Sequence, residues 1–224
     1  MTFSIVARCA ETGQFGMAIS SSSPAVAARC ANARAGVGAA ASQNITNPAL
    51  GGLMLDLLAQ GLSAPEAVAE AVKREKFPDY RQLLCVDAQG RTATWSGRNS
   101  LGIWGAAEGK GVAAGGNLLA DKAIPAAMVT AFEAAKGHLG DRLLTTMQAA
   151  LALGGEAGPV HSAGLLIVGT HPWPLAELRC DWEEGDPIAH ISRAWEVYRP
   201  QMEAYQTRAL DPRAAPAYGV PGEK

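Results

Sequence analysis

The residue with the greatest chemical potential in this chain is Thr2, which directly follows the initiator methionine. Removal of that methionine, which a small second residue permits, would place a free α-amino group on the residue that carries the hydroxyl. An α-amine titrates at about pH 7.7–8.0, so part of it is neutral at cellular pH and can accept the hydroxyl proton. Thr2 is therefore a candidate nucleophile for acyl transfer from an amide. The alternative is an ordinary strand residue, because threonine favours strands.

Acyl transfer also needs hydrogen-bond donors aimed at the oxyanion that develops on the substrate. Asn44 and Asn117 are candidates, because each follows a run of small residues at the expected end of a strand. Ser21 and Ser22, inside a run of four serines, are candidates for orienting the terminal amine. Each has a plainer interpretation as well, since asparagines form turns and a serine run before proline is commonly a loop.

The elements that would position these residues follow from periodicity. Alternation over residues 2–8 and 15–20 predicts a hairpin that returns the end of its second strand to Thr2. Apolar spacing predicts a helix between Pro48 and Gly61. We expect the following further elements: strands at 36–42, 82–87, 91–96, 162–170 and 177–182, a glycine-rich loop and then a strand ending at Asn117 within 101–117, and helices at 64–76, 124–135, 139–153 and from Pro187 to a kink or end at Pro200.

This order of elements predicts the fold class. Strands come in consecutive pairs, which favours antiparallel sheets, and pairs of helices fall between them. We therefore expect an α+β fold, a four-layer αββα sandwich of two antiparallel sheets flanked by helices. With 224 residues and 48% hydrophobic content the chain can build a substantial core. We assign residues 1–210 to a single domain and 211–224 to a flexible tail.

Composition excludes several classes of function. A formal charge of −2 without a basic stripe argues against nucleic-acid binding. No apolar run approaches the roughly 18 residues of a membrane span, and no signal-peptide pattern is present, so we expect a cytoplasmic protein. The scattered cysteines are expected to be free buried thiols. The histidines show no metal-binding spacing, and we expect neither a metal nor an organic cofactor. Homodimerisation through helical faces is plausible, but the sequence does not specify it.

Four segments carry a resemblance to a known family: TFSIVARCAETGQFGMAISSSSPAVAARCANARAGVGAAASQNITNPALGGLMLDLLAQGLSAPEA, RQLLCVDAQGRTATWSG, AAGGNLLAD and HSAGLLIV. In this order they resemble the bacterial domain of unknown function 1028, an uncharacterised family assigned to the N-terminal nucleophile (Ntn) hydrolase superfamily, over about residues 2–200. The resemblance implies the αββα fold and matches Thr2 to the position of the superfamily nucleophile. Two departures stand out. Serines occupy 20–23, where proteasome-type members keep an acidic residue, and the third strand lacks their lysine.

These observations lead to one expected function and two alternatives. We expect an Ntn-type amidohydrolase that cleaves a small amide, lactam or imide with Thr2. The first alternative is a non-catalytic module for small-molecule binding or assembly on the same fold, favoured by the two departures. The second is a hydrolase whose nucleophile is a serine of the 20–23 segment.

Overall fold

Ten strands form two antiparallel sheets in the computed structural model, which describes residues 2–220. A six-stranded sheet has the order β10-β9-β2-β1-β8-β7, and a four-stranded sheet has the order β3-β4-β5-β6. The strands are β1 Thr2–Arg8, β2 Phe15–Ser21, β3 Ala31–Arg34, β4 Gly38–Asn44, β5 Arg81–Asp87, β6 Thr92–Ser96, β7 Gly105–Gly109, β8 Val112–Asn117, β9 Ser162–Val168 and β10 Pro174–Cys180.

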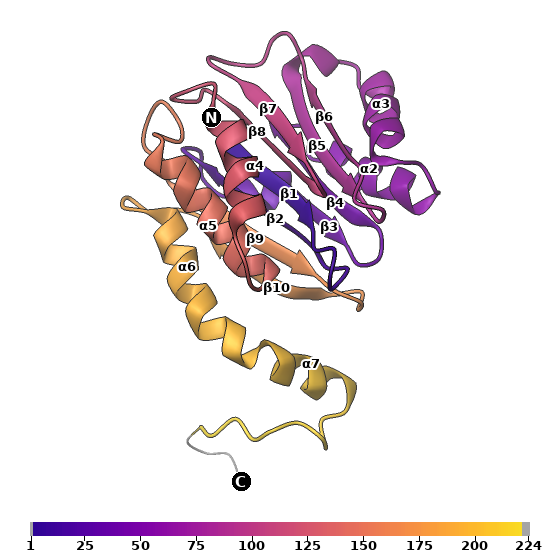
Figure 1. Cartoon of the computed structure of the whole chain (residues 1–224), viewed down its shortest axis with the longest axis vertical. Helices are drawn as coiled ribbons and strands as arrows, with labels where there is room; N and C mark the ends of the chain where they lie inside the picture. Colours follow the sequence, from indigo (N-terminus) through magenta and orange to yellow (C-terminus); the bar gives the residue numbers. More distant parts are fainter. Residues whose placement is uncertain (1, 221–224) are drawn as a thin grey trace.

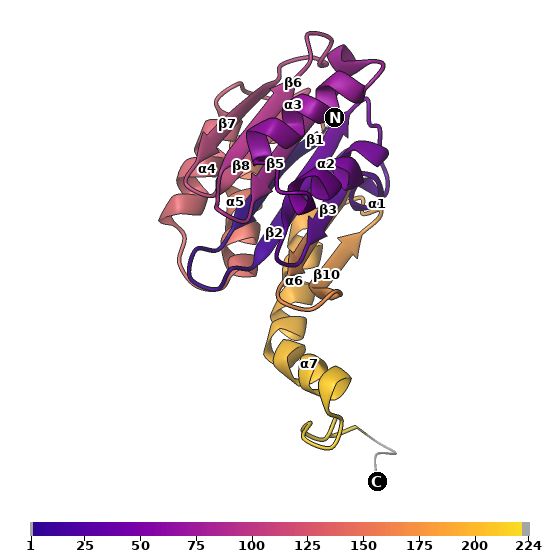
Figure 2. The ribbon, with the colours of Figure 1, turned by 90° about the vertical axis from the view of Figure 1, so that its right-hand side faces the viewer.

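Helices cover the outer face of each sheet, as Figures 1 and 2 show. The two helices α2 and α3 pack on the four-stranded sheet, whereas α4, α5 and α6 pack on the six-stranded one. The predicted four-layer αββα sandwich is therefore confirmed. The helices are α1 Val26–Cys30, α2 Ala49–Ala59, α3 Ala64–Arg74, α4 Ile124–Ala134, α5 Leu139–Ala152, α6 Pro187–Tyr198 and α7 Met202–Leu210, with short 3-10 turns at Pro78–Tyr80 and Arg199–Gln201.

The alternation of β1 divides its side chains between two cores. Phe3 and Ile5 face the layer of α4 and α5, while Val6 joins Met17 and Ile19 of β2 in the core between the sheets. Successive strand residues point to opposite faces. The other even-numbered positions of β1 therefore also face the space between the two sheets.

Several elements differ from the sequence prediction. Residues 105–109, expected to lie in a loop, form β7 and pair with β8, and α1 and β3 were not predicted at all. These segments are short or rich in Ala and Gly, so they lack the strong apolar alternation that marks a strand. Pro200 lies in the 3-10 turn after α6, and the chain resumes as α7. Proline is tolerated in a first helical turn because the N–H it lacks has no partner there.

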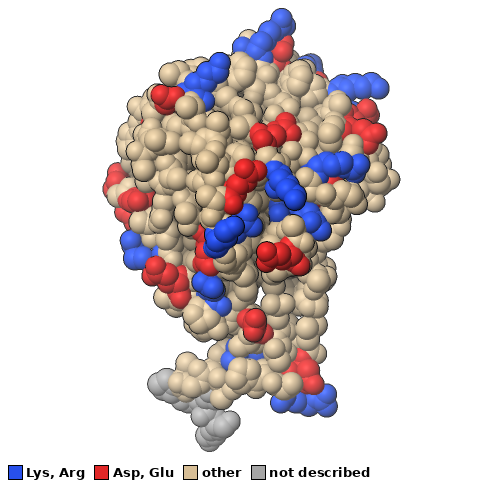
Figure 3. Space-filling view, viewed as in Figure 1, with Lys and Arg blue, Asp and Glu red and all other residues tan. Residues whose placement is uncertain are grey.

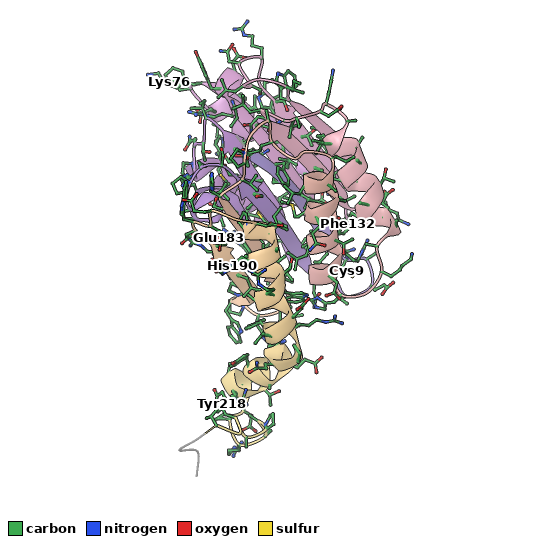
Figure 4. The ribbon with its side chains drawn as sticks, turned by 90° about the vertical axis from the view of Figure 1, so that its left-hand side faces the viewer. Cys9, Lys76, Phe132, Glu183, His190 and Tyr218 are labelled. Atoms are coloured by element: carbon green, nitrogen blue, oxygen red, sulfur yellow. The ribbon has the colours of Figure 1, made fainter. Side chains whose placement is uncertain are left out.

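Helix α7 projects from the body of the molecule as an arm (Figures 1 and 2). The chain folds back beside it, and the Arg208 guanidinium lies 3.7 Å from the centre of the Tyr218 ring. Figure 4 shows Tyr218 at the end of this arm, away from the sheets. The predicted tail of 211–224 thus begins where α7 ends, and residues 221–224 of it, like Met1, lie outside the described residues.

The molecular surface carries both signs of charge. On the face shown in Figure 3, lysine and arginine are interspersed with aspartate and glutamate. Within residues 2–220, no helix has the length and apolar character needed to cross a membrane.

Candidate active site

The core between the sheets becomes polar at one end. Past Val6, Met17 and Ile19, the inward positions of the same strands are held by Ser4, Thr2 and Ser21, joined from β8 by Asn117. Pairing of β1 with its neighbours brings them together: Thr2 lies opposite Asn117, and the Phe3–Ser20 pair places Ser21 beside Thr2. This group of Thr2, Ser4, Ser21 and Asn117, hereafter the polar cluster, has side chains no more than 5% exposed.

The hydroxyl of Thr2 donates to the Ser21 hydroxyl, with 3.4 Å between the oxygens. Ser21 Oγ lies 2.8 Å from Ser23 Oγ and accepts from the Ser23 backbone N–H at 3.1 Å. The hairpin predicted from the sequence therefore brings Thr2 and Ser21 within hydrogen-bonding reach. The chain of hydroxyls offers a path along which a proton can move from Thr2.

Two buried glutamines connect the polar cluster to the four-stranded sheet. Ser4 Oγ donates to Gln43 Oε1 at 2.6 Å, and Gln43 Nε2 donates to Gln82 Oε1 at 2.8 Å. Gln82 Nε2 in turn donates to the Gly116 carbonyl at 3.1 Å and to Ser96 Oγ at 3.0 Å. Because these acceptors hold the nitrogen of Gln82 on one side, its oxygen must face the cluster.

That orientation determines which end of the Asn117 amide faces Gln82. Asn117 Nδ2 donates to Gln82 Oε1 at 3.2 Å, so the Asn117 oxygen points elsewhere. This oxygen is buried and has no hydrogen-bond partner among the described residues. Asn117 thus presents an acceptor together with one remaining N–H. As an oxyanion donor, the role predicted for it, it has only that second N–H to offer.

Ser22 uses its backbone, not its hydroxyl, at this end of the sheet. Its N–H donates to both carboxylate oxygens of Glu156, at 3.2 and 3.1 Å, and the Glu156 side chain is buried in the segment after α5. Burial raises the pKa of Glu156 to about 7, although the bonds from Ser22 oppose the shift. A carboxyl group that titrates near neutral pH therefore lies one residue from the Thr2 partner Ser21.

Asn44, the other predicted oxyanion donor, bonds to the backbone of two loops. Its Nδ2 donates to the Tyr80 carbonyl at 2.7 Å, and its oxygen accepts from the Leu101 N–H at 3.2 Å. Its φ of 73° is in the left-handed region, which asparagine tolerates better than most residues. In the structure Asn44 joins two loops at the end of β4, and the bonds found for it do not include the polar cluster.

Sequence reasoning did not identify Gln43, Gln82 and Glu156 as members of the site. Gln43 stands in the polar run that followed the third predicted strand, so a signal for it existed. Gln82 lay within a predicted strand and showed no local feature. Glu156 lies in a loop 134 residues further along the chain than its partner Ser22. Only tertiary folding brings these two together.

The described residues contain no group of three or more histidine, cysteine, aspartate or glutamate side chains arranged to hold a metal. The four cysteines, Cys9, Cys30, Cys85 and Cys180, are buried free thiols. A surface hollow of 490 Å³ is lined by residues such as Arg34, His171 and Trp173, and another of 480 Å³ by Arg8, Lys110 and Arg142. Neither hollow includes Thr2.

Comparison with known proteins identifies the family. The model of a family of unknown function, DUF1028, matches residues 2–191. The chain belongs to the DUF1028 family. The expected resemblance is thereby confirmed at family level. The matched range includes both Thr2 and Glu156. A search of curated proteins returned no match.

A crystal structure of another DUF1028 protein, from Silicibacter pomeroyi, is similar to this chain with a TM-score of 0.82 and 28% identity, covering 88% of each chain. Anbu (ancestral beta-subunit) from Yersinia bercovieri matches at a TM-score of 0.39 and 12% identity, over 91% of this chain and 97% of its own. Anbu from Hyphomicrobium sp. strain MC1 gives 0.39 and 11%, over 92% and 98%. The two Anbu values are too low to carry an argument about the DUF1028 site.

Proposed function

We propose that this protein is an amidohydrolase of the Ntn type, which cleaves a small amide, lactam or imide through Thr2 after removal of Met1. The single observation that carries the proposal is the position of the Thr2 hydroxyl, at the start of a central strand and 3.4 Å from the Ser21 hydroxyl. A hydroxyl and an α-amine on one residue, inside a buried polar cluster, form a nucleophile with its own base.

The reaction would proceed in two stages. The amine of Thr2 accepts the hydroxyl proton while Oγ1 bonds to the amide carbon, and the tetrahedral intermediate then expels the amine product, which takes up that proton. Water, activated by the same α-amine, hydrolyses the ester and restores the hydroxyl. In this scheme the Ser21 hydroxyl orients Thr2, and the remaining N–H of Asn117 is a donor for the oxyanion.

One observation favours the non-catalytic alternative. The Thr2 side chain is only 5% exposed, and the two large hollows described above lie elsewhere. A binding or assembly module would need no access to this hydroxyl. The serine alternative draws on the same geometry, because Ser21 Oγ has a hydroxyl neighbour on either side, from Thr2 and Ser23.

Intact-mass measurement and a screen of small amides, lactams and imides test the proposal. We expect the mature chain to lack Met1, and Thr2→Ala to lower kcat/KM at least about a thousandfold while Thr2→Ser keeps measurable turnover. Thr130→Ala, on the exposed face of α4, is the matched control and should leave turnover unchanged.

Three results would reject this mechanism: a mature chain that retains Met1, full turnover by Thr2→Ala, or loss of turnover in Ser21→Ala with Thr2→Ala unaffected. The last result would transfer the nucleophile to the serine segment. Ligand-induced increases in Tm without turnover in any variant would favour the binding module.

A further inference from the structure

Glu156 is a buried carboxylate in a position that the family assignment does not explain. Glu156 is only 3% exposed. Both of its carboxylate oxygens accept a hydrogen bond from the backbone N–H of Ser22, the residue that follows β2. Within residues 2–220, no lysine, arginine or histidine lies within ion-pair distance of it. A buried charge is costly unless a cation or several donors compensate it.

The same segment is attached on the other side to the continuation of β8. The Ala157 N–H donates to the Leu118 carbonyl at 2.9 Å, the Ala120 N–H donates to the Gly155 carbonyl at 3.0 Å, and Glu156 forms an isolated bridge with Leu119. Residues 155–157 thus contact the chain immediately beyond the ends of both β2 and β8.

These two attachments locate Glu156 relative to Thr2. Strand β1 lies between β2 and β8 in the sheet, and Thr2 is opposite Asn117, the last residue of β8. A segment that contacts Ser22 on one side and Leu118 on the other must cross the sheet just past the first residue of β1. The backbone nitrogen of Thr2 is the first atom of that residue, so it lies at this end of β1.

We propose that Glu156 is a positioning residue whose carboxylate pairs with the α-ammonium group that Thr2 acquires when Met1 is removed. This inference rests on the proposed function, because it requires the trimmed chain. The buried Asn117 oxygen, which lacks a partner among the described residues, is a second acceptor on the strand opposite Thr2. Together the two acceptors would hold the amine beside the hydroxyl that it must deprotonate.

The pair also supplies a route for the proton. When a proton passes from the ammonium nitrogen of Thr2 to the Glu156 carboxylate, it leaves a neutral amine and a neutral carboxyl group, with no change in net charge. The amine can then accept the proton of Oγ1 as that oxygen bonds to the amide carbon. Burial raises the pKa of Glu156 to about 7, close to the range in which an α-amine titrates.

Two other side chains, those of His161 and Arg29, act on the same region. The His161 ring favours the ionised form of Glu156 electrostatically, and its Nδ1 lies 3.0 Å from the Glu183 carbonyl oxygen. The guanidinium of Arg29, on α1, donates to Ser23 Oγ at 3.1 Å. The residue that His161 contacts, Glu183, lies near His190 of α6 (Figure 4), with 3.4 Å between the Glu183 carboxylate and His190 Nδ1. The His161→Asn variant therefore separates the contribution of this ring from that of Glu156.

The test follows the titration of the Thr2 amine directly, by the pH dependence of the Thr2 ¹³Cα shift in trimmed, threonine-labelled protein. We expect Glu156→Gln to move the midpoint of the amine to lower pH, because a carboxylate stabilises the ammonium form. It should also lower kcat by about tenfold or more, with KM little changed. Glu177→Gln, at an exposed carboxylate of β10, is the matched control and should leave both measurements unchanged.

An amine midpoint that is the same in Glu156→Gln and the wild type overturns the inference, even where turnover still depends on Thr2. A midpoint that shifts in a protein without any turnover retains the ion pair and rejects the proposed function. If Glu156→Gln does not fold, Glu156→Asp replaces it: the shortened carboxylate should give a midpoint between those of the wild type and of a trimmed peptide of residues 2–8. A wild-type midpoint in Glu156→Asp would likewise count against the pair. The corresponding His161→Asn titration assigns any remaining transition.

Discussion

Gln82 determines how the amide groups around Thr2 are oriented. Its nitrogen bonds Ser96 and backbone carbonyls, and its oxygen accepts from both Gln43 and Asn117. An amide can satisfy donors and acceptors at once, whereas a carboxylate or an alkyl side chain at this position can serve only one kind or neither. The direction in which Asn117 presents its oxygen depends on this one side chain.

Replacing Gln82 with leucine should therefore destabilise the protein and disturb the site. The change leaves the Asn117 and Gln43 N–H groups and a backbone carbonyl buried without this partner, so we expect a loss of at least about 2 kcal/mol of unfolding free energy. Urea unfolding monitored by circular dichroism measures it. Gln89→Leu, in the exposed β5–β6 turn, should stay within about 0.5 kcal/mol of the wild type. Equal stability of the two variants would show that the amide network is dispensable.

At the scale of the element, strand β5 is held at both of its ends. Gln82 secures one end against the six-stranded sheet, and Asp87 secures the other against α3 and the β5–β6 turn. Asp87 accepts from the Ala64 N–H at 2.9 Å, next to the capping box that Ser63 and Glu66 form at the start of α3. A displaced β5 would carry Gln82 away from Asn117, so the distant turn contributes to the geometry of the polar cluster.

Asp87→Asn tests this contribution through its pH dependence. Burial alone would raise the pKa of Asp87, but bonds from Ala64, Arg91 and Gln89 outweigh it, so the pKa lies below its ordinary value. A lowered folded-state pKa means that the carboxylate stabilises the protein above the unfolded-state pKa and loses that effect as pH falls through the folded value. We expect Asp87→Asn to cost about 1–3 kcal/mol at neutral pH.

The difference between Asp87→Asn and the wild type should shrink as pH falls towards about 3, which unfolding curves at a series of pH values would measure. Asp56→Asn is the control, because its ion pair with Arg34 is exposed and should contribute less than about 1 kcal/mol. A difference for Asp87→Asn that stays constant with pH would contradict the assigned role of the charge.

At the scale of the whole molecule, the part of the chain that the structure describes has three apolar cores between its four layers, and the polar cluster lies at one end of the middle core. Helix α6 belongs to the outer core through Ile188, Ile191 and Trp195, whereas the arm of α7 extends beyond it (Figure 1). The boundary between domain and tail that we proposed after residue 210 follows a helix in which Met202 is the buried residue, and it stays a prediction.

Two truncations test this boundary. A chain ending at Leu210 should unfold within about 0.5 kcal/mol of the full chain, because it loses little buried apolar surface. A chain ending at Asp186 loses the four large buried side chains of Ile188, Ile191, Trp195 and Met202, each contributing about 1.5–3 kcal/mol, and should no longer unfold cooperatively. Calorimetry compares the two. A marked loss of Tm in the longer chain would place the tail inside the folded unit.

The sequence by itself determined the layer architecture and the return of the serine segment to Thr2, whereas the strand register in the structure selected Ser21 over Ser22. Both depend on local patterns, since the period of the apolar residues identifies strands and helices, and a tight hairpin must return its second strand to the first. It also identified Asn117 as the end of a strand. The weakly patterned β7 and β3 escaped it, because alanine and glycine give little contrast between the buried and exposed faces.

Only the tertiary structure decided what surrounds Thr2. The Gln82 amide comes from the opposite sheet. The Glu156 carboxylate comes from a loop 134 residues further along the chain than its partner Ser22. Nothing in the neighbourhood of either residue along the chain distinguishes it from an ordinary strand glutamine or loop glutamate. Their roles arise from burial and from contacts between distant segments, and these form only when the two sheets pack together.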